Sequence, residues 1–267
     1  MLAHADRVRR DFHELVRVED LTVRFEARER VVHAVNGVDL ALAEGETLVD
    51  RRMAETRQSA AILGVHRLEW LGYTDSGMTG WDRNSHPDAF MNADLDEAAG
   101  RLVAVLDEEN EDVLFGYDWH GGYGHPDHIM VHKVGHRAAE IANITTIFET
   151  TANRDHFRRM KEMAKANQEQ LPEGVSADDF DPDGPAHDGN PFGEPEANIS
   201  HQVDVLDYCE AKRNAIGCHA SQVTDSQWFL SMPPDVFKAA FGAEWFIRKG
   251  QSGPAKLGFL TDELTPS

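Results

Sequence analysis

The chain has 267 residues, of which 41% are hydrophobic, so it is long and apolar enough for one large domain or two small ones. Its formal net charge of −21 implies an acidic surface that repels phosphate backbones, which argues against nucleic acid as a partner. No apolar run is long enough to cross a bilayer and no apolar leader follows the first residues, so we expect a cytoplasmic protein without a membrane span.

The first 48 residues carry a strand pattern. Apolar and polar residues alternate in Leu15-Val-Arg-Val-Glu-Asp-Leu-Thr-Val-Arg-Phe25, and residues 31–48 continue with one or two more strand-like runs. Residues 14–48 together resemble the opening strands of an oligopeptide-type ABC transporter ATP-binding subunit. That family continues into a glycine-rich Walker A loop, but Val49-Asp-Arg51 follows here. We therefore expect residues 1–49 to form an ABC-ATPase-like β segment that lacks Walker A and has no ATP site.

From Asp50 onward the pattern changes to alternating helices and strands. Asp50 is placed to cap a helix that runs to Leu63, and Gly64 is placed to end it. The further expected elements are strands over residues 65–71, 113–118, 144–148 and 243–248, and helices after Asp94, from His128 and over residues 203–216. Such alternation predicts an α/β domain over residues 50–267, with a Rossmann-like, mostly parallel sheet flanked by helices.

One short stretch, residues 119–132, concentrates most of the polar chemistry. It holds four histidines, an aspartate and a tyrosine, and it follows an apolar run that reads as a buried strand. Glycines within it permit a tight turn, and Pro126 suits the first turn of a helix. In open α/β sheets, sites form at such strand-to-helix turns, outside the carboxyl ends of the strands.

The histidines of this stretch have two interpretations. Neutral imidazole is a common zinc ligand, and His128 and His132 stand four residues apart, on one face of the expected helix. The alternative is a solvated, histidine-rich loop without a ligand. From the residue types alone, we favour the metal site.

Gly122-Tyr-Gly-His-Pro-Asp-His128 resembles the second signature of the LmbE-like, or PIG-L, zinc-dependent N-deacetylases. The resemblance extends from about residue 50 to about residue 250, and its other parts are the stretches 52–65, 71–78 and 212–222. It implies zinc-dependent hydrolysis of an amide C–N bond, which removes the acetyl group from an N-acetylglucosamine-type substrate. The implied partner is therefore a small-molecule amino-sugar conjugate.

The resemblance assigns a role to each matching residue of the second signature. His128 matches the histidine that binds zinc. His125 matches the histidine that stabilises the oxyanion or protonates the leaving amine, and Asp127 is a carboxylate that can orient an imidazole. Tyr123 matches a tyrosine that hydrogen-bonds the developing oxyanion.

Two upstream residues match substrate-contacting positions of the family. These are Arg52, in the expected first helix, and Asp75, in the loop that follows it. Each has an alternative of about equal weight: an exposed helix arginine for Arg52, and a turn residue before Ser76 and Gly77 for Asp75.

The zinc site implied by the family is incomplete in this sequence. In the family, a first signature, His-Pro-Asp-Asp, supplies a histidine, an aspartate ligand and the general base, and no such segment occurs here. Of three zinc ligands only His128 has a counterpart, and catalytic zinc usually needs three protein ligands. We therefore expect residues 50–267 to lack the first strand and first metal signature. The alternative to a slow deacetylase is an inactive remnant or a non-catalytic sugar-binding protein.

Overall fold

The computed structural model describes the backbone of residues 3–4, 8–9, 14–27 and 30–43, and the chain over residues 47–109, 111–167, 177–178, 181–222, 230–258 and 260. It divides into two compact units. The first comprises residues 1–68 and 207–239, and the second comprises residues 69–206 and 240–267.

The N-terminal part of the first unit is an antiparallel sheet. Its strands are β1 (Ala3–His4), β2 (Val8–Arg9), β3 (Glu14–Ala27) and β4 (Arg30–Ala43). The long strand β3 pairs with each of the other three. The expected β-structure before Asp50 is therefore present. The resemblance of this segment to an ATPase subunit and the boundary after residue 49 remain predictions.

Helix α1 (Leu48–Leu63) follows, and its first turn differs from the prediction. Thr47, not Asp50, is the N-cap, and the Asp50 amide donates to the Thr47 hydroxyl oxygen at 3.1 Å. The Asp50 carboxylate in turn accepts the Thr47 backbone N–H at 2.9 Å, so the two residues form a reciprocal capping box. Gly64 ends the helix in a left-handed conformation, as predicted.

Most of the other described residues of the first unit are helical. It contains α6 (Cys209–Gly217), the short 3₁₀ turn η6 (Ala220–Gln222) and most of α8 (Pro234–Phe241), whereas the 3₁₀ turn η5 (Leu206–Tyr208) lies at the boundary between the units. The buried carboxylate of Glu55 on α1 accepts the amide and the hydroxyl of Ser221 at 2.9 and 2.6 Å. These two hydrogen bonds link α1 to η6. They stabilise the contact, because a buried carboxylate that loses its hydrogen-bond donors destabilises the folded state.

The second unit is built on a five-stranded sheet. Its strands are β5 (Val113–Tyr117), β6 (Thr146–Thr151), β7 (His201–Asp204), β8 (Ala243–Arg248) and β9 (Lys256–Leu257). They lie in the order β5-β6-β8-β7-β9. The β5–β6 and β7–β9 pairs are parallel, whereas β8 runs antiparallel to both of its neighbours. The α/β class predicted from the sequence is confirmed.

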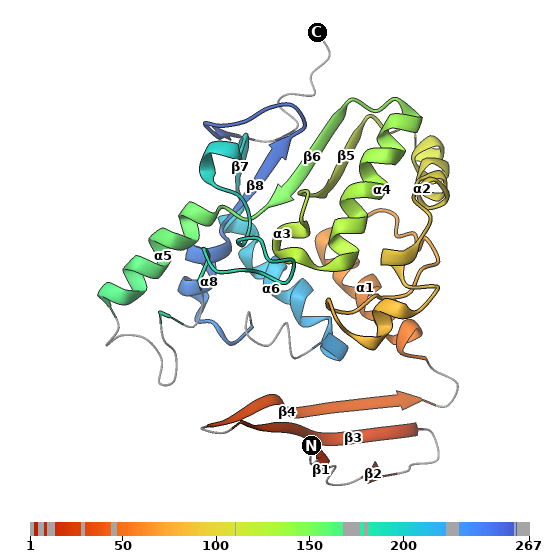
Figure 1. Cartoon of the computed structure of the whole chain (residues 1–267), viewed down its shortest axis with the longest axis vertical. Coiled ribbons are helices and arrows are strands. Elements are labelled where there is room, and N and C mark those ends of the chain that lie inside the picture. Colours follow the sequence, from red (N-terminus) through yellow and green to blue (C-terminus); the bar gives the residue numbers. More distant parts are fainter. Residues whose placement is uncertain are drawn as a thin grey trace. The chain divides into compact units, whose positions relative to one another are not determined.

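Helices and short turns complete the second unit (Figure 1). They are η1 (Asp82–Ser85), η2 (Phe90–Asn92), α2 (Leu95–Glu109), α3 (Gly121–Gly124), α4 (Pro126–Ala142), α5 (Arg154–Ala166) and η4 (Glu196–Asn198). Helix α4 packs against α2 and β5. One core cluster joins Leu106 of α2, Leu114 of β5, Ala138 of α4 and Ile147 of β6. This packing fixes α4 against the sheet edge from which the histidine-rich turn emerges.

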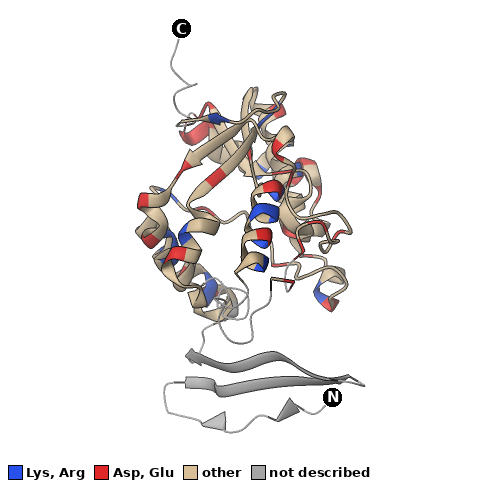
Figure 2. Cartoon of the chain, turned by 90° about the vertical axis from the view of Figure 1, so that its left-hand side faces the viewer, with Lys and Arg blue, Asp and Glu red and all other residues tan. Residues whose placement is uncertain are grey.

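Two expected elements differ from the structure. The strand expected over residues 65–71 does not form. Val65, Leu68 and Trp70 are exposed there, and none of the described strands pairs with this segment. The helix expected over residues 203–216 begins only at Cys209, because residues 201–204 pair with β8 instead. None of the described helices is long and apolar enough to cross a membrane. Figure 2 shows acidic positions throughout the described helices and loops.

Candidate functional site

The turn from Asp118 to His125 leaves the carboxyl end of β5 and leads into α4. Asp118 is fully buried, and its carboxylate accepts the amide of Gly122 at 2.7 Å and the hydroxyl of Thr151 at 2.6 Å. One side chain thereby ties the glycine turn to the neighbouring strand β6. The polar cluster therefore sits at the carboxyl edge of β5, as the sequence predicted.

His125 caps helix α4. Its Nδ1 accepts the backbone N–H of Asp127 at 3.1 Å, and Pro126 occupies the first turn. Because Nδ1 serves as an acceptor, the proton of a neutral His125 ring lies on Nε2. His125 therefore presents an N–H donor at its far end.

His128 has the opposite arrangement. Its Nδ1 lies 3.2 Å from the carbonyl oxygen of Gly121, so Nδ1 carries the proton and donates it to that oxygen. The free lone pair is then on Nε2, which is how a backbone carbonyl orients a metal-binding histidine. The ring stacks on Tyr117 with 4.0 Å between centroids and 5° between planes. Burial lowers the pKa of His128, which favours the neutral ring.

Gly121 allows this close approach of the turn to α4. It has a φ of +68°, and a Cβ placed there would collide with Cβ of His128. The neighbouring Gly122 has a φ of +74°, but a Cβ placed on it would meet no atom within 4 Å. The two glycines thus share a positive φ and differ in their surroundings.

Tyr123 stands beside both histidines. Its ring centroid lies 5.1 Å from that of His128 and 6.2 Å from that of His125, in edge-on arrangements. The two imidazole centroids are 5.0 Å apart. The structure therefore brings together three of the residues that the sequence singled out.

Asp127 binds a residue that the sequence analysis missed. Its carboxylate accepts the backbone N–H of Ser76 at 3.0 Å and the Ser76 hydroxyl, and Ser76 is fully buried. The contact of Asp127 with His125 described above uses the backbone amide of Asp127. The principal partner of this carboxylate is thus the loop around Ser76, which it holds against the first turn of α4.

Asp75 lies in that same loop. Its carboxylate accepts the amide of Gly77 at 2.7 Å and is 3.7 Å from the guanidinium of Arg83. Asp75, His125 and Asp127 each offer a ligand atom, and these atoms all lie within 4.8 Å of one another. Arg52, in contrast, lies on α1 of the first unit, whereas every other predicted site residue belongs to the second.

The second unit also contains a buried histidine with no assigned role, His120. It is 1% exposed, and neither ring nitrogen has a hydrogen bond to any residue that the structure describes. Nδ1 is 3.4 Å from a carboxylate oxygen of Asp188, and Nε2 is 4.0 Å from one of Asp118. No local pattern predicts this placement, because Asp188 is distant from His120 in the chain.

The residues present fit the zinc that the sequence resemblance implies only in part. His128 has the orientation of a ligand, as argued above. Within the described ranges, however, no group of three metal-ligating side chains includes His128. One imidazole does not make a catalytic zinc site, which usually has three protein ligands.

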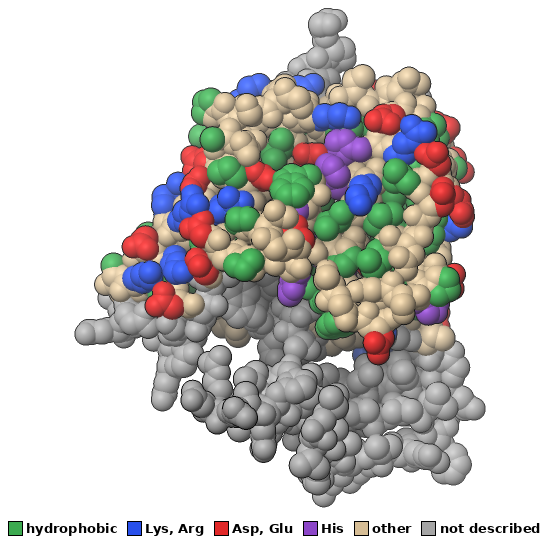
Figure 3. Space-filling view, viewed as in Figure 1, with side chains coloured by type: hydrophobic (Ala, Val, Ile, Leu, Met, Phe, Trp, Pro, Cys, Tyr) green, Lys and Arg blue, Asp and Glu red, His purple; other side chains and the backbone are tan. Residues whose placement is uncertain are grey.

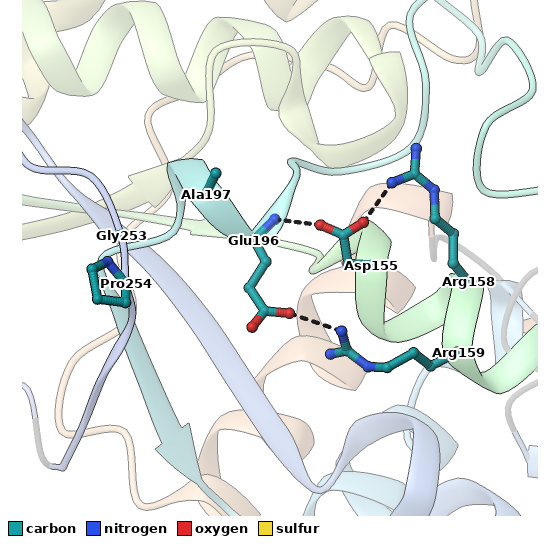
Figure 4. Close-up of a pocket in the computed structure, with 7 residues that line it drawn as sticks. All are labelled: Asp155, Arg158, Arg159, Glu196, Ala197, Gly253 and Pro254. Atoms are coloured by element: carbon teal, nitrogen blue, oxygen red, sulfur yellow. Dashed lines mark hydrogen bonds and ion pairs between the residues drawn. The ribbon is translucent and has the colours of Figure 1, made fainter.

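A cavity of about 680 Å³ lies elsewhere in the second unit (Figure 4). It is lined by Asp155, Arg158, Arg159, Glu196, Ala197, Gly253 and Pro254. Arg158 pairs with Asp155 and Asp183, and Arg159 pairs with Glu196 at 2.9 Å. Its charged groups thus neutralise one another, and none of the predicted site residues lines it, so we do not assign the substrate to this cavity.

Asp127→Asn is expected to destabilise the protein by about 1.5–3 kcal/mol, the usual range for hydrogen bonds to a charged group. The introduced carboxamide has one oxygen in place of the two carboxylate oxygens of Asp127. The buried Ser76 therefore loses one of its two hydrogen-bond acceptors. Urea denaturation measures the effect. The matched control is Asp96→Asn, which removes the exposed pair with Arg137 and should cost less than about 1 kcal/mol. Equal losses in the two variants would contradict the role given to Ser76.

Comparison with known proteins supplies the family. The protein-family model described as PIG-L, GlcNAc-PI de-N-acetylase, matches residues 24–139. This range begins before the domain boundary that the sequence predicts after residue 49. Several relatives are named 1D-myo-inositol 2-acetamido-2-deoxy-alpha-D-glucopyranoside deacetylase. The one from Thermobispora bispora is 33% identical over 234 residues, covering 82% of this chain and 74% of the relative. The one from a Nocardioides species is 34% identical over 252 residues, covering 84% and 80%. The chain therefore belongs to the PIG-L family.

Proposed function

We propose that this chain is a hydrolase that removes the acetyl group from an N-acetylglucosamine-type conjugate. The observation that carries the proposal is the opposed orientation of two imidazoles, with an N–H donor on His125 and a free lone pair on His128. The relatives are named as deacetylases of an inositol-linked acetamido sugar, which supports a small amino-sugar conjugate as the partner.

The chain's own residues would act on the amide as follows. When water adds to the acetamide carbonyl, the Nε2–H of His125 donates a hydrogen bond to the oxyanion. The proton lost by the water passes to the leaving nitrogen, and the C–N bond breaks to give acetate and a free amine. The hydroxyl of Tyr123 adds a second hydrogen bond to the oxyanion. Asp75 accepts hydrogen bonds from sugar hydroxyls.

Zinc, when bound, supplies a Lewis acid and a water of lowered pKa. We propose that His128 holds it through Nε2. Because the described donor set around His128 is incomplete, we expect weak zinc binding and slow turnover. The same observation supports a second candidate, a non-catalytic remnant that binds the sugar conjugate without cleaving it.

The test is amine production from N-acetylglucosaminyl-inositol during long incubations with added zinc, followed by mass spectrometry. We expect product from the wild-type protein and only the enzyme-free background from His125→Gln. His86→Gln is the matched control, because His86-Pro-Asp88 repeats the same triplet on an exposed turn. Product that persists in His125→Gln would contradict the assigned chemistry. Substrate binding without product in the wild type would favour the non-catalytic candidate.

A further inference from the structure

A second group of metal-ligating side chains lies outside the residues given a role above. His132 and His136 stand four residues apart on α4, and Glu149 lies on β6. Residues at this spacing share one face of a helix. We call these three residues the His132–His136–Glu149 cluster.

The three side chains converge on one point. Oε1 of Glu149 is 2.6 Å from Nε2 of His136 and 3.3 Å from Nδ1 of His132. The imidazole centroids are 4.3 Å apart, and one ligand atom from each residue lies within 4.8 Å of the others. Nδ1 of His132 is also 3.1 Å from the carbonyl oxygen of Tyr117. As in His128, Nδ1 of His132 carries the proton in this contact. Three side chains of metal-binding type therefore surround one small volume, and His132 must change its tautomer before Nδ1 can bind an ion.

The cluster is accessible but partly shielded. The side chains of His132, His136 and Glu149 are 20%, 21% and 13% exposed. An ion can therefore enter from solvent. Once it is bound, the partial burial of the three side chains limits the access of water molecules that compete with them for the ion. Figure 3 shows that histidine side chains reach the surface of the described part.

We propose that the His132–His136–Glu149 cluster binds one divalent ion of the zinc type, at a site separate from His128. Two imidazoles and a carboxylate form a donor set that Zn²⁺ accepts, with a water in the fourth position. Without metal, protons hold the three groups together as hydrogen bonds. Binding would replace those hydrogen bonds, because each imidazole would then carry its proton on the other ring nitrogen and present a lone pair to the ion.

The position of the cluster gives the bound ion a structural effect. His132 lies four residues after His128, about one turn further along α4. Glu149 belongs to β6, which pairs with the strand that ends at Tyr117. An ion held by all three residues would link α4 to β6 and fix the rotation of the helix that also carries His128.

The test is zinc binding to the full chain after removal of metal with a chelator, followed by calorimetry and metal analysis. We expect one equivalent of zinc to bind at the cluster in the wild-type protein, in His128→Gln and in His86→Gln. Glu149→Gln and His136→Gln should lose it, with Kd weakened by more than about 100-fold, since even partners outside the ligand shell contribute 10–100-fold. Stoichiometry is read without any activity, so the result does not depend on the proposed deacetylation.

Thermal unfolding supplies a second readout. Glu149→Gln keeps the size of the side chain and one oxygen acceptor, and circular dichroism shows whether it folds. Zinc should raise the Tm of the wild type and of His128→Gln by several degrees and leave Glu149→Gln unchanged. The proposal is overturned if the wild type binds no zinc, if Glu149→Gln and His136→Gln bind it as the wild type does, or if only His128→Gln loses it. Any of these results would leave the cluster as a hydrogen-bonded group alone.

Discussion

Amine release from N-acetylglucosaminyl-inositol by the zinc-supplemented protein is expected to be about 10²–10⁴-fold slower than by a PIG-L protein that carries the His-Pro-Asp-Asp segment, the range that a general base contributes. The sequence contains no such segment, and its resemblance to the family assigns the base and two zinc ligands to it. His125 and Tyr123 remain, and the roles proposed for them concern the oxyanion. They do not replace the group that activates water.

The comparison requires both proteins at equal concentration, with zinc varied, so that weak metal binding and slow chemistry can be separated. If only metal binding were impaired, saturating zinc would restore the rate. If the base is missing, the rate should level off far below that of the intact family member. A saturating rate equal to that protein's would contradict the prediction and would require another carboxylate, such as Asp75, to serve as the base.

Gly121→Ala is expected to destabilise the protein by about 2–6 kcal/mol. The positive φ alone costs a non-glycine residue about 1–3 kcal/mol. The added Cβ also collides with His128, and such overpacking typically costs a further 1–3 kcal/mol. Relief of the collision would move the turn away from α4 and weaken the hydrogen bond from His128 to the Gly121 carbonyl.

Gly122→Ala is the matched control, because Gly122 has a similar φ and open space around it. It should lose only the conformational part, so Gly121→Ala should exceed it by about 1–3 kcal/mol. Urea denaturation of both variants measures this difference. Equal destabilisation would mean that the turn shifts freely and that its contact with His128 contributes little.

Local signals in the sequence predicted much of the fold. Asp94 caps α2 through the Glu97 amide at 2.9 Å, and Pro126 opens α4, because caps and first-turn prolines act within a few residues. The strand over residues 243–248 was predicted with the bounds that β8 has. The strand over residues 65–71 was wrong, since an apolar run becomes a strand only where a partner strand covers it.

For the candidate site too, the sequence predicts local features but not contacts between distant residues. The order of His125 and His128 on one turn follows from the local signature, and the structure brings both beside Tyr123. The bond between Asp127 and Ser76 joins residues 51 positions apart, and His120 meets Asp188 across a still longer separation. No periodicity or spacing encodes such contacts, because they depend on how loops pack after the sheet has formed.

The anchoring of the glycine turn by Asp118 has a consequence for its motion. The amide of Gly122 and the hydroxyl of Thr151 share one buried carboxylate, and the Asp118 amide itself donates to the carbonyl of Thr150 at 3.1 Å. Hydrogen exchange at Gly122 therefore requires the end of the β5–β6 pair to open as well. Regions that open together in this way form one cooperative unit. Although the turn is rich in glycine, its Gly122 amide hydrogen would thus exchange as slowly as the amide hydrogens at the end of the β5–β6 pair. It would not exchange as fast as those of a free loop.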